Sequence, residues 1–173
     1  MHDTSRPAPW TTVRRTDDRT SFYDDLAHEI DALLTGEPDS VANAANAAAA
    51  IYHALPELNW AGFYFLRNGE LVLGPFQGRP ACVRIAVGKG VCGTAAAERR
   101  SVLVPDVEAF PGHITCDTAS RSELVVPLLA GDLLLGVLDL DSPVLARFDA
   151  VDQAGCEGLV RVIVRHLTVS QPL

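Results

Sequence analysis

The chain lacks any long run of apolar residues, and it has no hydrophobic segment near its start. None of its apolar runs approaches the roughly 20 residues that a bilayer-spanning helix needs. Residues 1–20 are polar and of mixed charge, without the apolar stretch of a secretory signal peptide. We therefore expect a cytoplasmic protein with no membrane segment, and we predict that residues 1–20 form a flexible N-terminal arm.

Dense positive charge is also missing. The 173 residues include 14 Lys and Arg against 22 Asp and Glu, which gives a formal net charge of −8 at pH 7. Basic residues are at most paired, as at Arg14-Arg15 and Arg99-Arg100. Nucleic acids and anionic membranes attract proteins that carry a basic patch, so we expect neither as a partner.

The usual sequence signatures of metal and cofactor sites are absent. The four cysteines include no C-x-x-C pair, on which zinc sites usually build. The glycine-rich residues 88–94 lack the spacing of a phosphate loop or a dinucleotide-binding loop. We therefore expect no bound metal and no cofactor. A chain of this length can build a core without disulfides, so clustered cysteines in it favour redox chemistry.

The spacing of apolar residues predicts a single α+β domain over residues 21–173. Two N-terminal segments and one C-terminal segment have helical spacing, whereas the middle of the chain alternates between apolar runs and turn signals such as Asn68-Gly69. This order predicts one antiparallel sheet with helices packed on it. The predicted helices span 21–34, 40–55, 91–98 and 149–167, and the predicted strands span 60–66, 70–73, 81–87, 102–104, 123–129 and 133–140.

Cys116 lies in the longest irregular segment that the sequence predicts, residues 110–121. Long loops are uncommon unless they carry function, and a purely structural cysteine more often lies in an apolar strand or helix. A reactive thiolate needs partial exposure and nearby positive charge or hydrogen-bond donors. His113 could supply this, or it could be an ordinary turn residue. The sequence therefore predicts a reactive Cys116.

The other cysteines leave the partner of Cys116 open. Either Cys82 or Cys92 could reach it if the loop folds over the edge of the sheet. Spacing alone does not decide between them, because a disulfide requires Cα atoms within about 7 Å. Cys156 lies in the last predicted helix, where we expect a packed thiol.

Three carboxylates form a second candidate group. Asp139 and Asp141 are two residues apart, so they point to the same face of a strand, and Glu123 begins the neighbouring strand. Carboxylates on a core strand are costly unless they are used. One could bind an ammonium group, and one could stay protonated and donate to a developing oxyanion. Alternatively, the two aspartates simply mark a strand end that meets solvent.

Trp60 and Tyr64 form the third candidate group. They are four residues apart on one predicted strand and therefore share a face. Aromatic rings make favourable contacts with sulfur, so the pair could hold a methyl-sulfur group. Ordinary core packing is the alternative.

Seven segments of the chain together resemble the free methionine-(R)-sulfoxide reductases. The resemblance covers about residues 21–167. It is specific because Cys82, Cys92 and Cys116 are separated by 10 and 24 residues, a cysteine set that other GAF domains do not share. The segments are NWAGFY (59–64), LGPFQG (73–78), ACVRI (81–85), GVCGTA (90–95), VPDV (104–107), FPGHITCD (110–117) and GVLDLDSP (136–143).

This resemblance implies a GAF fold, with a six-stranded antiparallel sheet flanked by helices. It implies reduction of free methionine (R)-sulfoxide rather than of sulfoxide within proteins, with thioredoxin as the source of electrons and a homodimer as the assembly. It implies that Cys116 is the attacking thiol and Cys82 its resolving partner, and that Cys92 is a third family cysteine. The residues implied to line the substrate site are Trp60, Tyr64, Glu123, Asp139 and Asp141.

The implied chemistry passes through a sulfenic acid on Cys116. Attack on the sulfoxide sulfur releases methionine, Cys82 condenses with the sulfenic acid to form a disulfide, and thioredoxin reduces that disulfide. One carboxyl would protonate the oxygen and another would hold the ammonium group, and the sequence leaves this assignment open. The rival hypothesis is a non-catalytic GAF sensor of small molecules or redox state, which would bind ligand without consuming thiols.

Overall fold

The computed structural model describes residues 18–112 and 118–167. Over these residues the helices and strands follow one another in the order that the sequence predicts. The elements are α1 (Arg19–Leu34), α2 (Ser40–Ala54), β1 (Trp60–Arg67), β2 (Glu70–Gly78), β3 (Arg84–Ala86), α3 (Gly90–Glu98), β4 (Val102–Val104), the 3-10 turn η1 (Val107–Ala109), β5 (Ser122–Ala130), β6 (Leu133–Ser142) and α4 (Ala150–Arg165).

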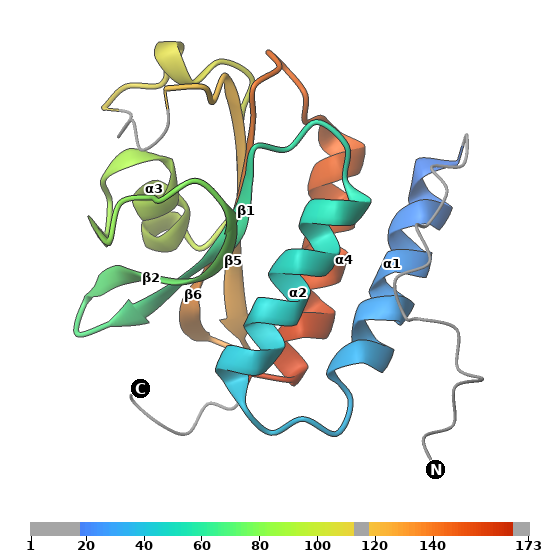
Figure 1. Ribbon diagram of the computed structural model, residues 1–173. Helices are drawn as coiled ribbons and strands as arrows, with labels where there is room; N and C mark the ends of the chain where they lie inside the picture. Colours follow the sequence, from blue (N-terminus) through green and yellow to red (C-terminus); the bar gives the residue numbers. More distant parts are fainter. Residues whose placement is uncertain (1–17, 113–117, 168–173) are drawn as a thin grey trace.

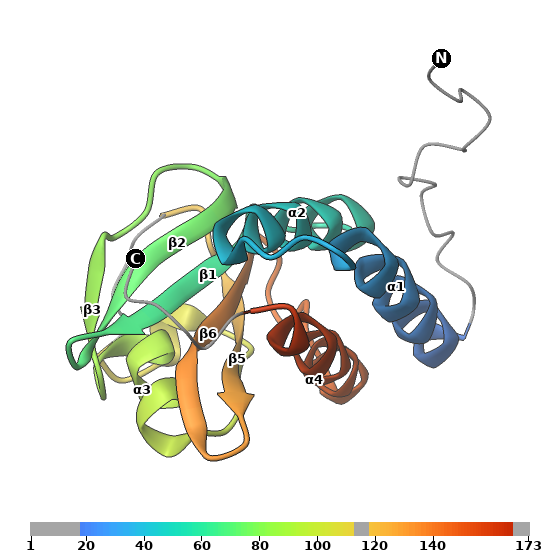
Figure 2. The ribbon, with the colours of Figure 1, turned by 90° about the horizontal axis from the view of Figure 1, so that it is seen from below.

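The six strands form one sheet in the order β3-β2-β1-β6-β5-β4, and every neighbouring pair is antiparallel. Helices α2 and α4 cover one face of the sheet, and α1 packs against α4 on the outside of that layer (Figures 1 and 2). Helix α3 lies on the opposite face (Figure 1). The predicted α+β architecture with a six-stranded antiparallel sheet is therefore confirmed.

The alternation of side chains along β1 divides the interior into two cores. Ala61 and Phe63 point toward α1, α2 and α4, and they join the larger core. Trp60 and Tyr64 point toward α3, and they join the smaller core. The shared face predicted for Trp60 and Tyr64 is thus confirmed, because successive residues of a strand face opposite sides of the sheet.

Two strands differ from their predicted ranges by three residues or more at one end. Strand β2 runs on to Gly78, because the register with β1 shifts between Gly62 and Tyr64 and this irregularity accommodates Gly74 and Pro75 opposite it. Conversely, the predicted strand at 81–87 is reduced to β3 (Arg84–Ala86), which pairs only with β2 at the sheet edge. Cys82 therefore lies in the irregular segment before β3 and not within a strand.

Capping residues set the helix ends that the apolar pattern left approximate. The side chain of Asp18 accepts hydrogen bonds from the backbone N–H groups of Thr20 and Ser21, so α1 begins at Arg19, two residues earlier than predicted. Asp149 and Asp152 form a reciprocal capping box at the start of α4. Residues 1–17 lie outside the described part of the chain, so the predicted flexible arm stays a prediction.

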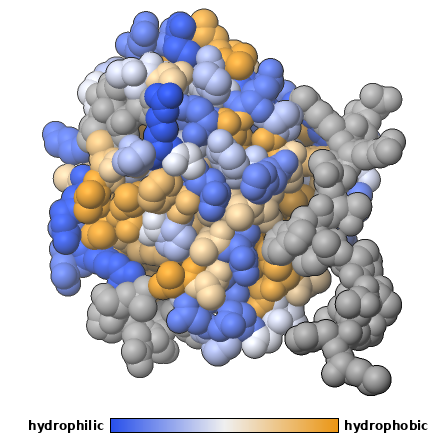
Figure 3. All heavy atoms as spheres, in the orientation of Figure 1, coloured by the Kyte–Doolittle hydropathy of each residue, from blue (hydrophilic) through white to orange (hydrophobic). Residues whose placement is uncertain are grey.

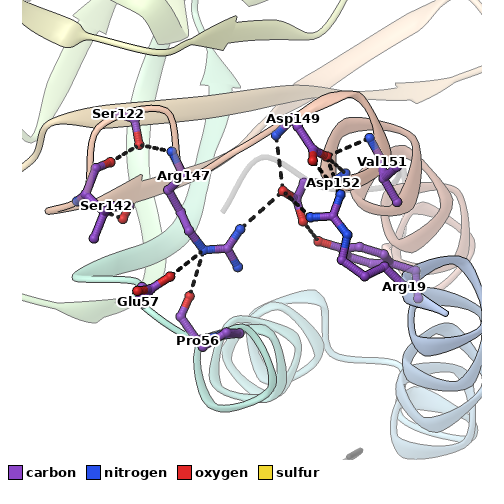
Figure 4. Close-up of polar contacts among 11 residues, drawn as sticks. Arg19, Pro56, Glu57, Ser122, Ser142, Arg147, Asp149, Val151 and Asp152 are labelled. Carbon is purple, nitrogen blue, oxygen red and sulfur yellow. Dashed lines mark hydrogen bonds and ion pairs between the residues drawn. The ribbon is translucent and has the colours of Figure 1, made fainter. Parts of the chain in front are cut away.

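A buried polar network joins α1, the end of α2 and the start of α4 (Figure 4). The side chains of Arg147 and Asp152 are only 5% and 3% exposed, and Arg147 Nη1 lies 3.2 Å from Asp152 Oδ2. Arg147 Nε donates to the carbonyl oxygen of Pro56 over 3.1 Å, and the Tyr23 hydroxyl donates to Asp152 Oδ1 over 2.7 Å. Because the central members Tyr23, Arg147 and Asp152 are buried and hydrogen-bonded, the network fixes how these helices meet.

Cys156 on α4 packs beside this network. Its side chain is fully buried and carries a free thiol. Burial, with the nearby charge of Asp152, raises the pKa of Cys156 to about 12, so the group stays a neutral thiol. The sequence-based expectation of a packed cysteine is confirmed.

The surface mixes polar and apolar residues. In Figure 3 the hydrophobic residues gather in a band across the middle of the face, with hydrophilic residues above and below it. Large apolar side chains that are exposed, such as Val83 and Leu133, are distributed over several elements. Within residues 18–112 and 118–167, each helix is too short or too polar to cross a bilayer.

We predict that Asp152→Asn lowers the free energy of unfolding by about 3 kcal/mol, because it removes the buried counter-charge of Arg147 and leaves that guanidinium only Glu57, whose side chain is more than half exposed and whose Oε2 lies 3.5 Å away. Asp31→Asn is the matched control, since Asp31 pairs with Arg165 and His166 on the surface and its loss should change stability little. Urea unfolding followed by circular dichroism measures both. Equal effects of the two substitutions would contradict a structural role for the buried pair.

Candidate functional site

The predicted site residues of β1, β5 and β6 meet on the face of the sheet that α3 covers. Asp141 of β6 lies between Trp60 of β1 and Glu123 of β5, as the register of both strand pairs shows. Asp139 lies two residues along β6, opposite Gly62. Strand register alone therefore brings together residues that are up to 81 positions apart in the sequence.

Aromatic rings form a layer beside the carboxylates. The ring of Trp60 stacks on Tyr64 with centroids 5.9 Å apart and on Phe76 with centroids 5.3 Å apart. Gly62 makes this layer possible, because a Cβ atom there would clash with the Cβ of Phe76 and would lie 2.6 Å from the ring of Trp60. The layer is part of the smaller core, and it borders the acidic residues.

The polar atoms of the two β1 aromatics hold the segment that contains Cys82. Trp60 Nε1 donates to the carbonyl oxygen of Arg79 over 3.1 Å, and the Tyr64 hydroxyl donates to the carbonyl oxygen of Cys82 over 3.0 Å. Burial, together with the charges of Asp139 and other acidic neighbours, raises the pKa of Tyr64, so its hydroxyl remains a donor. The aromatic pair therefore packs the core and also positions the backbone around Cys82.

Glu123 and Asp139 form a buried acidic pair, each with only 6% of its surface exposed. Burial raises the pKa of both groups well above the ordinary range, and the charge of Asp141 raises that of Glu123 further. The two carboxyls are hydrogen-bonded to each other, so they titrate as a pair and not as separate groups. Because both pKa values are raised, the pair keeps a proton at a pH where an exposed carboxylate would have lost it.

One oxygen of the pair has no protein partner. Within the described residues, Asp139 Oδ1 is buried and makes no hydrogen bond. Buried polar atoms are nearly always satisfied, and exceptions concentrate at sites that bind something. This oxygen is therefore an acceptor that a bound molecule could use.

Cys92 completes the group from the α3 side. Its side chain is 4% exposed, and Sγ lies 4.0 Å from Glu123 Oε1. Gly93 lets α3 approach the sheet this closely, because a Cβ atom there would clash with the carbonyl oxygen of Ala86. Burial raises the pKa of Cys92 well above its usual value, and the charges of Asp139 and Glu123 raise it further. Such a thiol is a poor nucleophile, and a catalytic role for Cys92 stays a prediction.

Ligand atoms of these three residues lie close enough to share one ion. Cys92, Glu123 and Asp139 each offer one sulfur or oxygen atom, and these atoms lie within 4.8 Å of one another. The sequence suggested no such set, because its three members come from three separate elements and form no short motif.

The cysteines differ in their bonding state and in whether the structure describes them. Cys82 is half-buried and disulfide-bonded, whereas Cys92 and Cys156 are free thiols. Cys116 lies outside the described residues, as does His113. The role of Cys116 as nucleophile and the possible assistance of His113 therefore stay predictions.

Sequence reasoning missed two contributions to the site. Phe76 belongs to the aromatic layer, but the strand predicted over residues 70–73 stops short of it. Asn59 Nδ2 donates to Ser120 Oγ over 3.0 Å and ties the start of β1 to the segment before β5. The signal for Phe76 was available in Gly62, because a glycine inside a strand often marks the close approach of a neighbouring group.

Comparison with known proteins agrees with this geometry. The family model for the GAF domain matches residues 18–170. A free methionine-R-sulfoxide reductase of Escherichia coli is 48% identical over 152 residues, which cover 88% of this chain and 92% of that protein. One from Saccharomyces cerevisiae is 42% identical, covering 84% and 85% respectively.

A solved structure extends the agreement to three dimensions. The free methionine-R-sulfoxide reductase of Neisseria meningitidis, in complex with its substrate, is 42% identical and superposes with a TM-score of 0.84, covering 88% of this chain and 92% of that one. Together with the fold and the extent of the sequence identity, this likeness shows that the chain belongs to the GAF-domain family of free methionine-R-sulfoxide reductases.

Proposed function

We propose that this protein reduces free methionine (R)-sulfoxide to methionine. The observation that carries the proposal is the buried pair of Glu123 and Asp139 next to a stacked aromatic layer, where burial raises the pKa of both carboxyls and favours their protonated form. A sulfoxide oxygen must gain a proton as its bond to sulfur breaks, and a neutral buried carboxylic acid is suited to supply it.

In the first step the Cys116 thiolate attacks the substrate sulfur. The oxygen passes to the cysteine sulfur, the substrate sulfur keeps the electron pair of the broken bond, and Asp139 provides the proton that the oxygen takes up. The products are methionine and Cys116 sulfenic acid. We assign the acid to Asp139 rather than to Glu123 because, within the described residues, Asp139 Oδ1 makes no hydrogen bond and is available to the substrate.

The remaining carboxylates suit the ammonium group of a free amino acid. Asp141 is only partly buried and lies beside Trp60, on the same side of β6 as Asp139. Glu123 lies across the strand pair from it. A negative charge at this end of the site would favour a free amino acid over a residue within a peptide, whose nitrogen carries no charge.

In the second step the Cys82 thiol condenses with the sulfenic acid, releases water and forms a disulfide. Two facts support this pairing: Cys82 is disulfide-bonded, and Cys92 and Cys156 are free, so the fourth cysteine is the remaining candidate partner. Thioredoxin then returns both thiols to the reduced state by thiol–disulfide exchange. We further infer a homodimer that acts in the cytoplasm.

Without a reductant, wild-type protein mixed with free methionine (R)-sulfoxide should release about one methionine per chain and lose two thiols as a Cys82–Cys116 disulfide. Peptide mapping by mass spectrometry identifies the bridge. Cys116→Ser should release no methionine. Cys82→Ser should complete one turnover and then stop, and Cys156→Ser should turn over repeatedly with thioredoxin. Substrate binding that leaves the thiol count unchanged would instead support the sensor hypothesis.

Asp139→Asn should reduce the rate of methionine formation by about 10²-fold or more, because an amide cannot donate the proton. Wild-type kcat should fall as pH rises through the raised pKa of Asp139, since the acid is active only while protonated. This fall should be absent in Asp139→Asn, which is slow at every pH. A pH profile of single-turnover rates tests both statements. An unchanged rate and profile in Asp139→Asn would reject this residue as the acid.

The pH dependence of the free energy of unfolding gives a separate test of the raised pKa of Asp139. In the unfolded chain Asp139 ionises at an ordinary pKa, whereas the folded protein keeps the proton to higher pH. Between these values the folded state binds more protons, so the free energy of unfolding falls as pH rises, by at most about 1.4 kcal/mol per pH unit.

An asparagine at position 139 does not ionise, so in Asp139→Asn this group no longer lowers the free energy of unfolding as pH rises. The variant should therefore be more stable than wild type at neutral pH. The advantage should shrink as pH falls through about 4, the ordinary pKa of aspartate, and it should vanish below that pH, where both states of the wild type are protonated. Asp132→Asn, in the exposed turn between β5 and β6, is the control and should change stability little. Unfolding curves in urea across the pH range would show the effect, and a variant destabilised most at neutral pH would contradict it.

A further inference from the structure

We propose that Cys92, Glu123 and Asp139 form a binding site for a zinc-class divalent ion, and that the ion excludes substrate when it is bound. The first argument is geometric. The three ligand atoms lie within 4.8 Å of one another, and Cys92 Sγ lies 4.0 Å from Glu123 Oε1. Zinc binds sulfur at about 2.3 Å and carboxylate oxygen at about 2.0–2.2 Å, so its ligands are roughly 3.5–4 Å apart. Small side-chain rotations are enough to close the group around one ion.

The second argument is the oxygen that has no partner. Asp139 Oδ1 is buried without a hydrogen bond in the described part of the chain, and Asp139 as a whole is only 6% exposed. A cation beside it would satisfy this oxygen directly. This observation is independent of the close spacing of the three ligand atoms, because carboxyl groups that lie close together can hydrogen-bond to one another through all their oxygens.

The kinds of ligand select the kind of ion. A thiolate with two carboxylates suits zinc or cobalt, whereas calcium and magnesium require oxygen ligands in larger numbers. Three protein ligands leave one position of a tetrahedral ion open, which is typical of zinc sites that react or exchange. The ligands come from α3, β5 and β6, so the packing of α3 on the sheet holds the site together.

Metal binding should compete with catalysis. This consequence rests on the proposed function, because Asp139 and Glu123 would serve as ligands in one state and would meet the substrate in the other. A bound ion also replaces the proton that Asp139 donates. Zinc would then be a reversible inhibitor and not a cofactor of the reaction.

The binding test uses Cys82→Ser/Cys116→Ser protein, in which Cys92 and Cys156 are the remaining thiols. Titration with Co²⁺ should produce a thiolate-to-cobalt charge-transfer band that saturates at one ion per chain and disappears when Zn²⁺ is added. Adding Cys92→Ser to this background should remove the band, and adding Cys156→Ser, the matched control, should leave it. Absence of the band, or its persistence without Cys92, overturns the proposal.

The carboxylates provide a second measurement that does not depend on replacing the thiol. Asp139→Asn and Glu123→Gln should each weaken Co²⁺ binding at least about tenfold, since even the loss of an outer-shell partner commonly costs this much. Circular dichroism checks that each variant is folded, and Cys92→Ala replaces Cys92→Ser if the serine variant is not. Unchanged affinity in both carboxyl variants would overturn the assignment of the ligands.

The inhibition test separates this proposal from the proposed function. In wild-type protein Zn²⁺ should raise the apparent KM for methionine (R)-sulfoxide with little change in kcat, and a chelator should restore the initial rate. Cobalt binding that depends on Cys92 without any reductase activity would leave the metal site standing and reject the proposed function. Reductase activity without cobalt binding would do the reverse.

Discussion

The burial of two carboxyl groups against each other is the constraint on which the site depends. An ionised carboxylate in a low-dielectric interior is costly, and a second one beside it is more costly still. The pair of Glu123 and Asp139 avoids this by keeping one proton, and the register between β5 and β6 holds the two strands so that the proton can be shared. The fold therefore keeps an acid in its neutral form at a pH where an exposed aspartate would have lost its proton.

This arrangement requires stability from elsewhere, and the opposite face of the sheet provides it. A buried polar atom without a partner costs about 1–3 kcal/mol, and Asp139 Oδ1 is such an atom. The larger core between the sheet and α1, α2 and α4 is almost entirely apolar. Its buried charges, Arg147 and Asp152, are paired and hydrogen-bonded. The core on one face of the sheet thus stabilises the fold, and this stability offsets the cost of the unpaired buried oxygen on the other face.

The sequence predicted the architecture and most of the site, and the limits of that prediction have physical causes. Periodicity identified the helices and strands, and it placed Trp60 and Tyr64 on one face. It also suggested that Glu123 joins the two aspartates, because adjacent strands bring their ends together. Periodicity could not predict that the pKa values of Glu123 and Asp139 are raised, since that depends on how deeply the two side chains are buried. It could not place Cys92 beside them either, because the position of α3 on the sheet is set by tertiary packing.

The error at residues 81–83 has a consequence for the chemistry. A cysteine within a strand has its Cβ direction set by the ladder, whereas a disulfide demands particular distances and angles between two residues. Cys82 instead lies in an irregular segment that side chains of the central strand hold by the carbonyl oxygens of Arg79 and Cys82. Two hydrogen bonds of this kind fix the position of the segment but leave the cysteine more freedom than a ladder would. The resolving role proposed for Cys82 requires its bond to form and break in every cycle, and a backbone held outside the ladder is compatible with that requirement.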